Sequence, residues 1–150
     1  RKVSVKAFNH PLGRSTMSFF ATPSLRQRLQ GDFPACLNGA PLLSPGPASS
    51  ARAPFDAWLT RKRLRPQVVG EFDDLALMAA FGREGRGVFV SPTVLQAETE
   101  AQYGVQAIGR SDELVEEFVA ISVERRISHP CVVAITTAAR RQLFERAGGG

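Results

Sequence analysis

The most constraining feature of this 150-residue sequence is a strand–helix–strand pattern between residues 67 and 90. Gln67–Phe72 is predicted as a strand, Asp73-Asp74 as a helix start, Leu75–Arg83 as an amphipathic helix, and Gly87–Val90 as a second strand. A helical crossover between parallel strands is right-handed, so both strands end at one edge of the sheet. Ligands of open α/β folds bind at that edge. We therefore predict an α/β fold with a ligand site where these strands end.

Further strands and helices flank this unit. A turn is predicted at His10–Gly13, and Trp58 is predicted to anchor the core from an apolar helix face. Gly82, Gly85 and Gly87 are interpreted as turn glycines, because a phosphate-binding glycine loop would follow a strand and open a helix. The remaining predicted strands cover Lys2–Phe8, Met17–Ala21, Ala40–Leu43, Val105–Ile108 and Glu117–Glu124, and the remaining helices cover Pro23–Leu29, Ala51–Arg63, Thr93–Ala101 and a terminal stretch that begins near His129.

Composition and charge exclude several classes of protein. The chain is 43% hydrophobic and 22% charged, as in globular domains, and no apolar run approaches the roughly 20 residues that cross a bilayer. The net charge of +5 is densest at residues 61–65, but no aromatic residues interleave with it, so we interpret it as a solvated helix end rather than a nucleic-acid surface. Cys36 and Cys131 lack metal-ligand spacing and are expected to be reduced. The sequence does not begin with Met, so we expect a portion of a longer, soluble protein.

No arrangement of residues in the sequence indicates catalysis. His10 and His129 each precede a proline and adjoin no serine or cysteine nucleophile, so structural roles are favoured, and no cofactor is expected. Asp73-Asp74 has two interpretations: both residues cap the helix, or one of them faces the cleft and senses a cation. In the second case Ser44 and Ser91-Pro92-Thr93 would supply further oxygen groups from neighbouring loops.

Several motifs resemble a known family. Val69–Asp74, Leu77–Gly82 and Gly85–Pro92, in this order, resemble the second lobe of the regulatory domain of LysR-type transcription regulators. Shorter runs are similar to the branch of that family that activates a sodium/proton antiporter gene: Phe19-Phe20-Ala21, Phe33-Pro34, Gly39–Leu43, Gly70–Asp74, Tyr103-Gly104-Val105 and Ile121–Arg126. Together these motifs span nearly the whole chain.

The resemblance implies a two-lobed α/β fold of the type 2 periplasmic-binding-protein-like class, with the second lobe complete and the first partial. The hinge strands would lie near Ser15–Ala21 and Glu117–Glu124. The implied division is residues 1–21 for part of the first lobe and the hinge, 22–39 for a connecting helix and loop, 40–126 for the second lobe, 127–146 for the return to the first lobe with a C-terminal helix, and 147–150 for a tail.

The resemblance also implies function. An effector would bind between the lobes, and this chain would contribute Ser44, Phe72, Asp73, Asp74, Ser91, Pro92 and Thr93. The whole protein would be a cytoplasmic activator of an antiporter gene that responds to sodium or alkaline pH and forms a homodimer or tetramer. It would contact operator DNA only through an amino-terminal winged helix-turn-helix, which this sequence lacks, and it would not contact a membrane.

Two other classes of protein use similar lobes. A solute-binding protein that feeds a transporter would carry an export signal in the sequence upstream of Arg1, whereas a regulator would carry a helix-turn-helix there. An α/β enzyme is disfavoured because the sequence contains no recognisable pairing of nucleophile and base.

Overall fold

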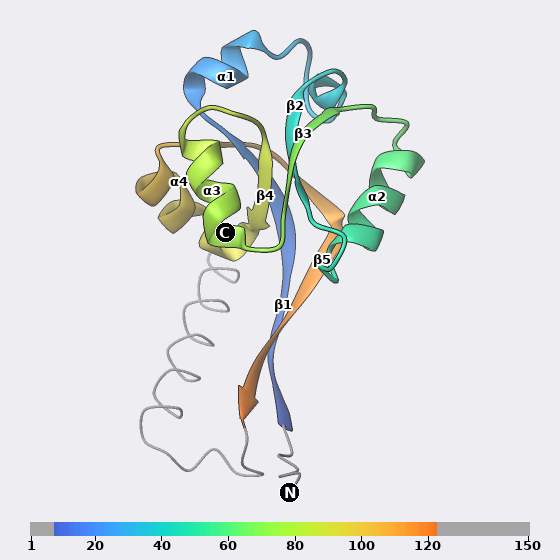
Figure 1. The fold of residues 1–150 in the computed structure, drawn as a ribbon, viewed down its shortest axis with the longest axis vertical. Coiled ribbons are helices and arrows are strands. Elements are labelled where there is room, and N and C mark those ends of the chain that lie inside the picture. The colour runs from blue at the N-terminus through green and yellow to red at the C-terminus, as the bar shows by residue number, and fades with distance from the viewer. Residues whose placement is uncertain (1–7, 123–150) are drawn as a thin grey trace, which may run out of the picture.

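The computed structural model describes residues 8–122, so the strand predicted from Lys2, the helix predicted from His129, and Cys131 lie outside the described residues. None of the helices within 8–122 has the length and apolarity that crossing a bilayer requires. The elements follow one another in the order β1 (Phe8–Ala21), α1 (Pro23–Arg28), η1 (Ala35–Leu37), β2 (Pro41–Pro45), α2 (Arg52–Arg61), β3 (Gln67–Phe72), α3 (Leu75–Arg83), β4 (Phe89–Pro92), η2 (Thr93–Leu95), α4 (Gln96–Tyr103) and β5 (Gln106–Ser122) (Figure 1).

The strands form two hydrogen-bonded groups that meet at a single bridge. One group has the order β4-β1-β5 with antiparallel pairing, and the other is the parallel pair β2-β3. A parallel bridge between Leu42 and Val88 joins them, because the Leu43 amide donates to the Val88 carbonyl at 2.8 Å and the Val88 amide donates to the Pro41 carbonyl at 2.8 Å. The predicted crossover from β3 to β4 therefore passes over β2 rather than joining adjacent strands.

Helices cover both faces of this sheet (Figure 1). Side chains alternate between the faces of a strand, so neighbouring residues enter different cores. On one face Phe19 stacks on Trp58 of α2 with ring centroids 5.2 Å apart, which confirms the predicted anchor. On the other face Phe20 and Phe89 pack with Met78 of α3. This two-sided burial is the usual arrangement of an open α/β sheet.

A long antiparallel ribbon, β1 with β5, crosses the domain and extends beyond its body in Figure 1. Its register runs from Phe8 opposite Ser122 to Ala21 opposite Gln106. The turn predicted at His10–Gly13 is wrong, because the chain continues through it as strand with a register shift between Pro11 and Gly13. The extra residue of a bulge lets an extended chain pass a proline that cannot donate to the ladder.

Of the two strands predicted over 105–108 and 117–124, residues 106–108 and 117–122 belong to the single strand β5. The register moves from Thr16–Val115 to Met17–Ser111, so residues 112–114 form a bulge without partners on β1. Leu114 of this bulge is buried in the core beside α2. Lys62 and Arg61, at the end of α2, bind the Glu113 carboxylate at 2.7 Å and 3.3 Å. The basic helix end is exposed, in line with the prediction of a solvated end, and it is also attached to the bulge.

The interpretation of Gly82 as a turn glycine is wrong. Gly82 lies inside α3, where a Cβ atom would overlap the ring of Phe89. Glycine is required at this position by close packing of helix against strand rather than by a turn. Gly85 has a φ of +73° and is a turn residue as predicted.

Candidate functional site

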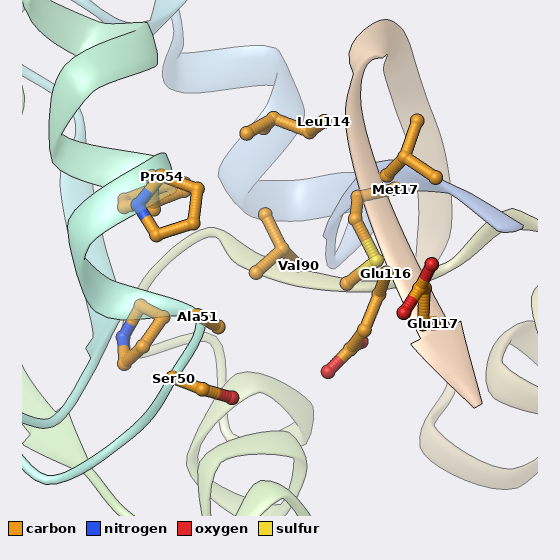
Figure 2. Close-up of a pocket in the computed structure, with 11 residues that line it drawn as sticks. Met17, Ser50, Ala51, Pro54, Val90, Leu114, Glu116 and Glu117 are labelled. Carbon is orange, nitrogen blue, oxygen red and sulfur yellow. The ribbon is translucent and has the colours of Figure 1, made fainter. Parts of the chain in front are cut away.

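A cavity of about 290 Å³ opens between the start of α2, the end of β2 and the β1–β5 ribbon. Figure 2 shows its wall, with α2 on one side and β5 on the other. The cavity lies at the carboxyl end of β2, the position where α/β sheets bind ligands. Its lining comprises Met17, Pro45, Ser50, Ala51, Pro54, Phe55, Val90, Leu114, Val115, Glu116 and Glu117.

The apolar part of the wall follows from strand pairing. In the β1–β4 register Phe19 lies opposite Val90 and Met17 opposite Pro92, so these four residues share one face of the sheet. Met17 and Val90 are both less than a tenth exposed and line the cavity. Leu114 adds to the same wall because the bulge turns it inward. The floor of the cavity is therefore continuous with the core under α2.

The loop that leads into α2 forms the opposite wall, and it is attached to the end of β3. The Gly46 amide donates to the Phe72 carbonyl at 2.7 Å, and a Cβ atom on Gly46 would overlap the Asp73 carboxylate. Farther along, Ser49 Oγ accepts from the Ala51 amide at 3.2 Å. These contacts place Ser50 and Ala51 at the rim.

Two carboxylates from β5 complete the lining. Glu117 forms an ion pair with Arg14 at 2.7 Å, and both side chains are mostly exposed. Glu116 is half-buried, forms no ion pair within residues 8–122, and its burial raises the pKa of its carboxyl. Figure 2 shows the Glu116 side chain extending from β5 toward the side of the cavity where Ser50 lies. Glu116 is thus the ionisable group that a bound molecule would meet.

None of the predicted site residues lines this cavity, although Ser44, Phe72 and Asp73 lie near it at the ends of β2 and β3. Ser44 is buried and its hydroxyl donates to the Pro45 carbonyl at 3.1 Å. Phe72 packs against Phe81 with centroids 5.2 Å apart, and Asp73 lies beside Gly46.

Asp74 begins α3. Its Oδ1 accepts from the amides of Ala76 at 2.9 Å and Leu77 at 3.4 Å. The capping interpretation is therefore confirmed for Asp74. In the described part of the chain, no group of three or more His, Cys, Asp or Glu residues lies close enough to hold a metal ion.

Thr93 belongs to a different hollow. Its hydroxyl bonds Thr16 and Ser18 of β1, at 2.8 Å each, and the Val94 amide donates to Ser15 Oγ at 3.3 Å. This hydroxyl cluster fixes η2 to β1 and borders a second cavity of about 610 Å³, whose lining also includes Arg14, Arg110 and Asp112. Ser91 and Pro92 end β4 between the two cavities and line neither.

Several residues that line the cavity were not predicted from the sequence, among them Pro45, Val90, Leu114 and Glu116. Pro45 and Val90 each adjoin a predicted residue, Ser44 and Ser91, so alternation along a strand would have indicated them had the inward face been known. Leu114 and Glu116 depend on the bulge, which no local pattern announces.

The sheet with helices on both faces and the crossing ribbon form a mixed α/β fold of the type 2 periplasmic-binding-protein-like class, as predicted. Residues 7–147 match the family described as the LysR substrate binding domain, and the chain belongs to this family. It is 36% identical over 140 residues to the transcriptional activator protein NhaR of Escherichia coli strain K12, which covers 93% of this chain and 46% of that protein. The chain therefore spans about half the length of this relative.

Solved structures show the same fold. The effector domain of the transcriptional regulator AmpR of Pseudomonas aeruginosa matches with a TM-score of 0.64 and 18% identity, over 95% of this chain and 67% of that one. The effector binding domain of QuiR in complex with shikimate matches with a TM-score of 0.60 and 13% identity, over 93% of this chain and 66% of that one. NhaR is a transcriptional activator and AmpR a transcriptional regulator, and the family is one of regulators, which agrees with the prediction that the chain is not an enzyme.

Proposed function

We propose that this chain senses an effector for a LysR-type transcriptional activator, and that the cavity between α2 and the β1–β5 ribbon is its part of the effector site. The observation that carries the proposal is the position of the cavity: it lies at a strand end, has an apolar floor, and is bordered by the ribbon. A ligand here touches both the sheet, through Val90, and the ribbon, through Met17 and Glu116.

The ribbon suggests how binding would be transmitted. Both segments predicted as hinge strands, Ser15–Ala21 and Glu117–Glu124, fall largely within it. We take residues 40–126 as the second lobe, residues 127–146 as the return to the first lobe, and residues 1–21 as part of the first lobe together with the hinge. The ligand would then be enclosed when the first lobe closes over the cavity. The difference between the affinities of the ligand for the closed and open arrangements would determine how strongly it activates transcription.

We infer that the gene controlled by the whole protein encodes a sodium/proton antiporter, on the strength of the similarity to NhaR. Sodium or alkaline pH would be the signal. Asp73 is the candidate for a role in the sodium response, because Asp74 already caps α3. Ser44, Phe72, Ser91, Pro92 and Thr93 stay predicted contributors to the effector site.

The cavity is tested by filling it. In the full-length protein, Ala51→Trp places an indole at the rim, whereas Ala57→Trp makes the same change on the exposed side of the same helix. Expression from the target promoter is measured in matched sodium chloride and potassium chloride, together with operator binding. We expect Ala51→Trp to lose the sodium response and keep operator binding, because the indole would keep the lobes from closing over the cavity, and Ala57→Trp to keep both. A normal response in Ala51→Trp would contradict the assignment of this cavity.

The sodium role of Asp73 has a separate test. Asp73→Asn removes the charge and retains the shape, and Asp74→Asn is its control because asparagine caps helices as well as aspartate does. We expect only Asp73→Asn to blunt the sodium response. Equal responses in both variants and the parent protein would remove Asp73 from the mechanism.

We also propose a homodimer or tetramer in which the edge of β3 takes part. Within the described residues β3 pairs only with β2, and its Val68 and Val69 side chains are 49% and 50% exposed. Leu77 and Phe81 of the adjoining α3 are exposed as well. An apolar open edge of this kind favours association. Light scattering on full-length Val69→Lys should show a smaller particle than the parent, and an unchanged mass would exclude this edge.

A further inference from the structure

We propose that the cavity selects a small organic cation, a protonated amine on an apolar body, and that the Glu116 carboxylate reads its charge. This inference rests on the part of the proposed function that makes the cavity an effector site, because it names the class of molecule that the cavity accepts. The proposed sodium role belongs to Asp73, which lies outside the lining.

The first support is the charge of the lining. Among residues 8–122, the lining contains two glutamates and no lysine, arginine or histidine. An organic anion placed among these side chains would meet no positive side chain and would approach two carboxylates. An isolated buried anion without a cationic partner is strongly disfavoured, so an anionic ligand has no means of compensation from these side chains.

The second support is the difference between the two glutamates. Glu117 is neutralised by Arg14 at 2.7 Å, at the exposed rim. Glu116 forms no ion pair within residues 8–122, is half-buried, and its burial raises the pKa of its carboxyl. The ionised carboxylate is thus poorly solvated, and a cation bound beside it would compensate for the water it has lost.

Nearby positive groups do not cancel this charge. Arg52, in the first turn of α2, is engaged by the Asp56 carboxylate at 2.7 Å and the Glu71 carboxylate at 3.1 Å, so its own charge is offset. Lys62 and Arg61 bind Glu113 at the other end of α2. The amino-terminal end of α2 contributes only about half a positive charge.

The size and walls of the cavity favour an organic cation over a monatomic one. A volume of about 290 Å³ is several times the roughly 30 Å³ that a water molecule occupies. Its floor consists of Met17, Val90 and Leu114, whose alkyl groups and sulfur supply none of the oxygen ligands that a hard cation needs. These groups instead suit a hydrocarbon body, with Glu116 at the rim to bind the ammonium.

Three probes of the same shape test the charge preference. Cyclohexylmethylamine, cyclohexylmethanol and cyclohexanecarboxylate are titrated into the full-length protein in potassium chloride buffer, with ligand-observed NMR and calorimetry as readouts. We expect the amine to bind at least about tenfold more tightly than the carboxylate, which corresponds to about 1.4 kcal/mol. Glu116→Gln should remove most of this difference. Asp112→Asn, which removes the same charge from an exposed site on the same strand outside the cavity, should retain it.

Other outcomes would overturn the proposal. Equal or tighter binding of the carboxylate, no measurable binding of the amine, or an unchanged preference in Glu116→Gln would each contradict the charge selection. A sodium chloride titration that displaces the amine at equal concentration would favour a monatomic cation instead. Ala51→Trp distinguishes the failure of this inference from the failure of the proposed function. If this variant abolishes the binding of whichever probe binds, the cavity remains the effector site even where the charge selection fails.

Discussion

Leu114 provides the sharpest test of how the domain is held together. It is 6% exposed, it lies in the β5 bulge, and it packs into the core under α2. Truncating a buried leucine to alanine costs about 2–5 kcal/mol. Part of the Leu114 side chain already borders the cavity, so fewer contacts are lost than at a fully enclosed site, and we expect Leu114→Ala to cost about 2–3 kcal/mol. For a domain of this class that cost lowers the melting temperature by about 5–10 °C.

The measurement is thermal unfolding of the full-length protein, followed by the fluorescence of Trp58, which lies in the same core as Leu114. Val115→Ala is the matched control, because Val115 is adjacent on the strand and 49% exposed. It should cost less than about 1 kcal/mol. Equal shifts in the two variants would refute the inward placement of Leu114, and with it the bulge as described.

Three further predictions concern single side chains. Glu116→Gln should raise the melting temperature at neutral pH. A carboxyl whose pKa is raised by burial stabilises the folded state when protonated, and this stabilisation is lost as the pH rises through its folded pKa. The difference in melting temperature between the variant and the parent should therefore shrink toward acidic pH, and a difference that does not change with pH would contradict this reasoning. Asp74→Ala should cost about 1 kcal/mol through loss of the α3 cap, while Asp74→Asn should cost little, which urea titration will distinguish. Gly82→Ala should destabilise the protein. The new Cβ atom would overlap the Phe89 ring, at a cost of about 1–3 kcal/mol, while alanine gains only about 1 kcal/mol in helix propensity. A rise in the urea midpoint would show instead that the Phe89 ring moves aside.

Much of the fold could be predicted because its signals are local. The bounds predicted for β3 and α3 match the structure residue for residue, since Gln67–Phe72 ends at an aspartate pair and Leu75–Arg83 has a clear apolar face. The start of α1 was equally readable, with Thr22 as the cap and Pro23 in the first turn. Such elements are determined by residues close together in the chain.

The β1–β5 ribbon could not be predicted from local pattern. Pro11 and Gly13 have the composition of a turn, and the charged residues of the β5 bulge interrupt the alternation of a strand. Yet β1 runs through Pro11 and Gly13, and β5 pairs with it on both sides of the bulge, across a separation of about one hundred residues. Cross-strand partners override local propensity in such cases. The lining of the candidate site was therefore the hardest part to predict, because Glu116 and Met17 line the same cavity only through this pairing. By contrast, the aspartate pair Asp73-Asp74 could be singled out in the sequence, because it lies at a helix start and the signals of a helix start are local.

The β5 bulge also restricts how the chain length can vary. Side chains alternate with a period of two, so the loss of one residue between Ser111 and Glu116 would move every following side chain to the other face of the ribbon. Glu116 would leave the cavity and Leu114 would leave the core. Insertions and deletions should therefore be excluded from residues 112–114, although these residues lack partners on β1 and have the composition of a permissive loop.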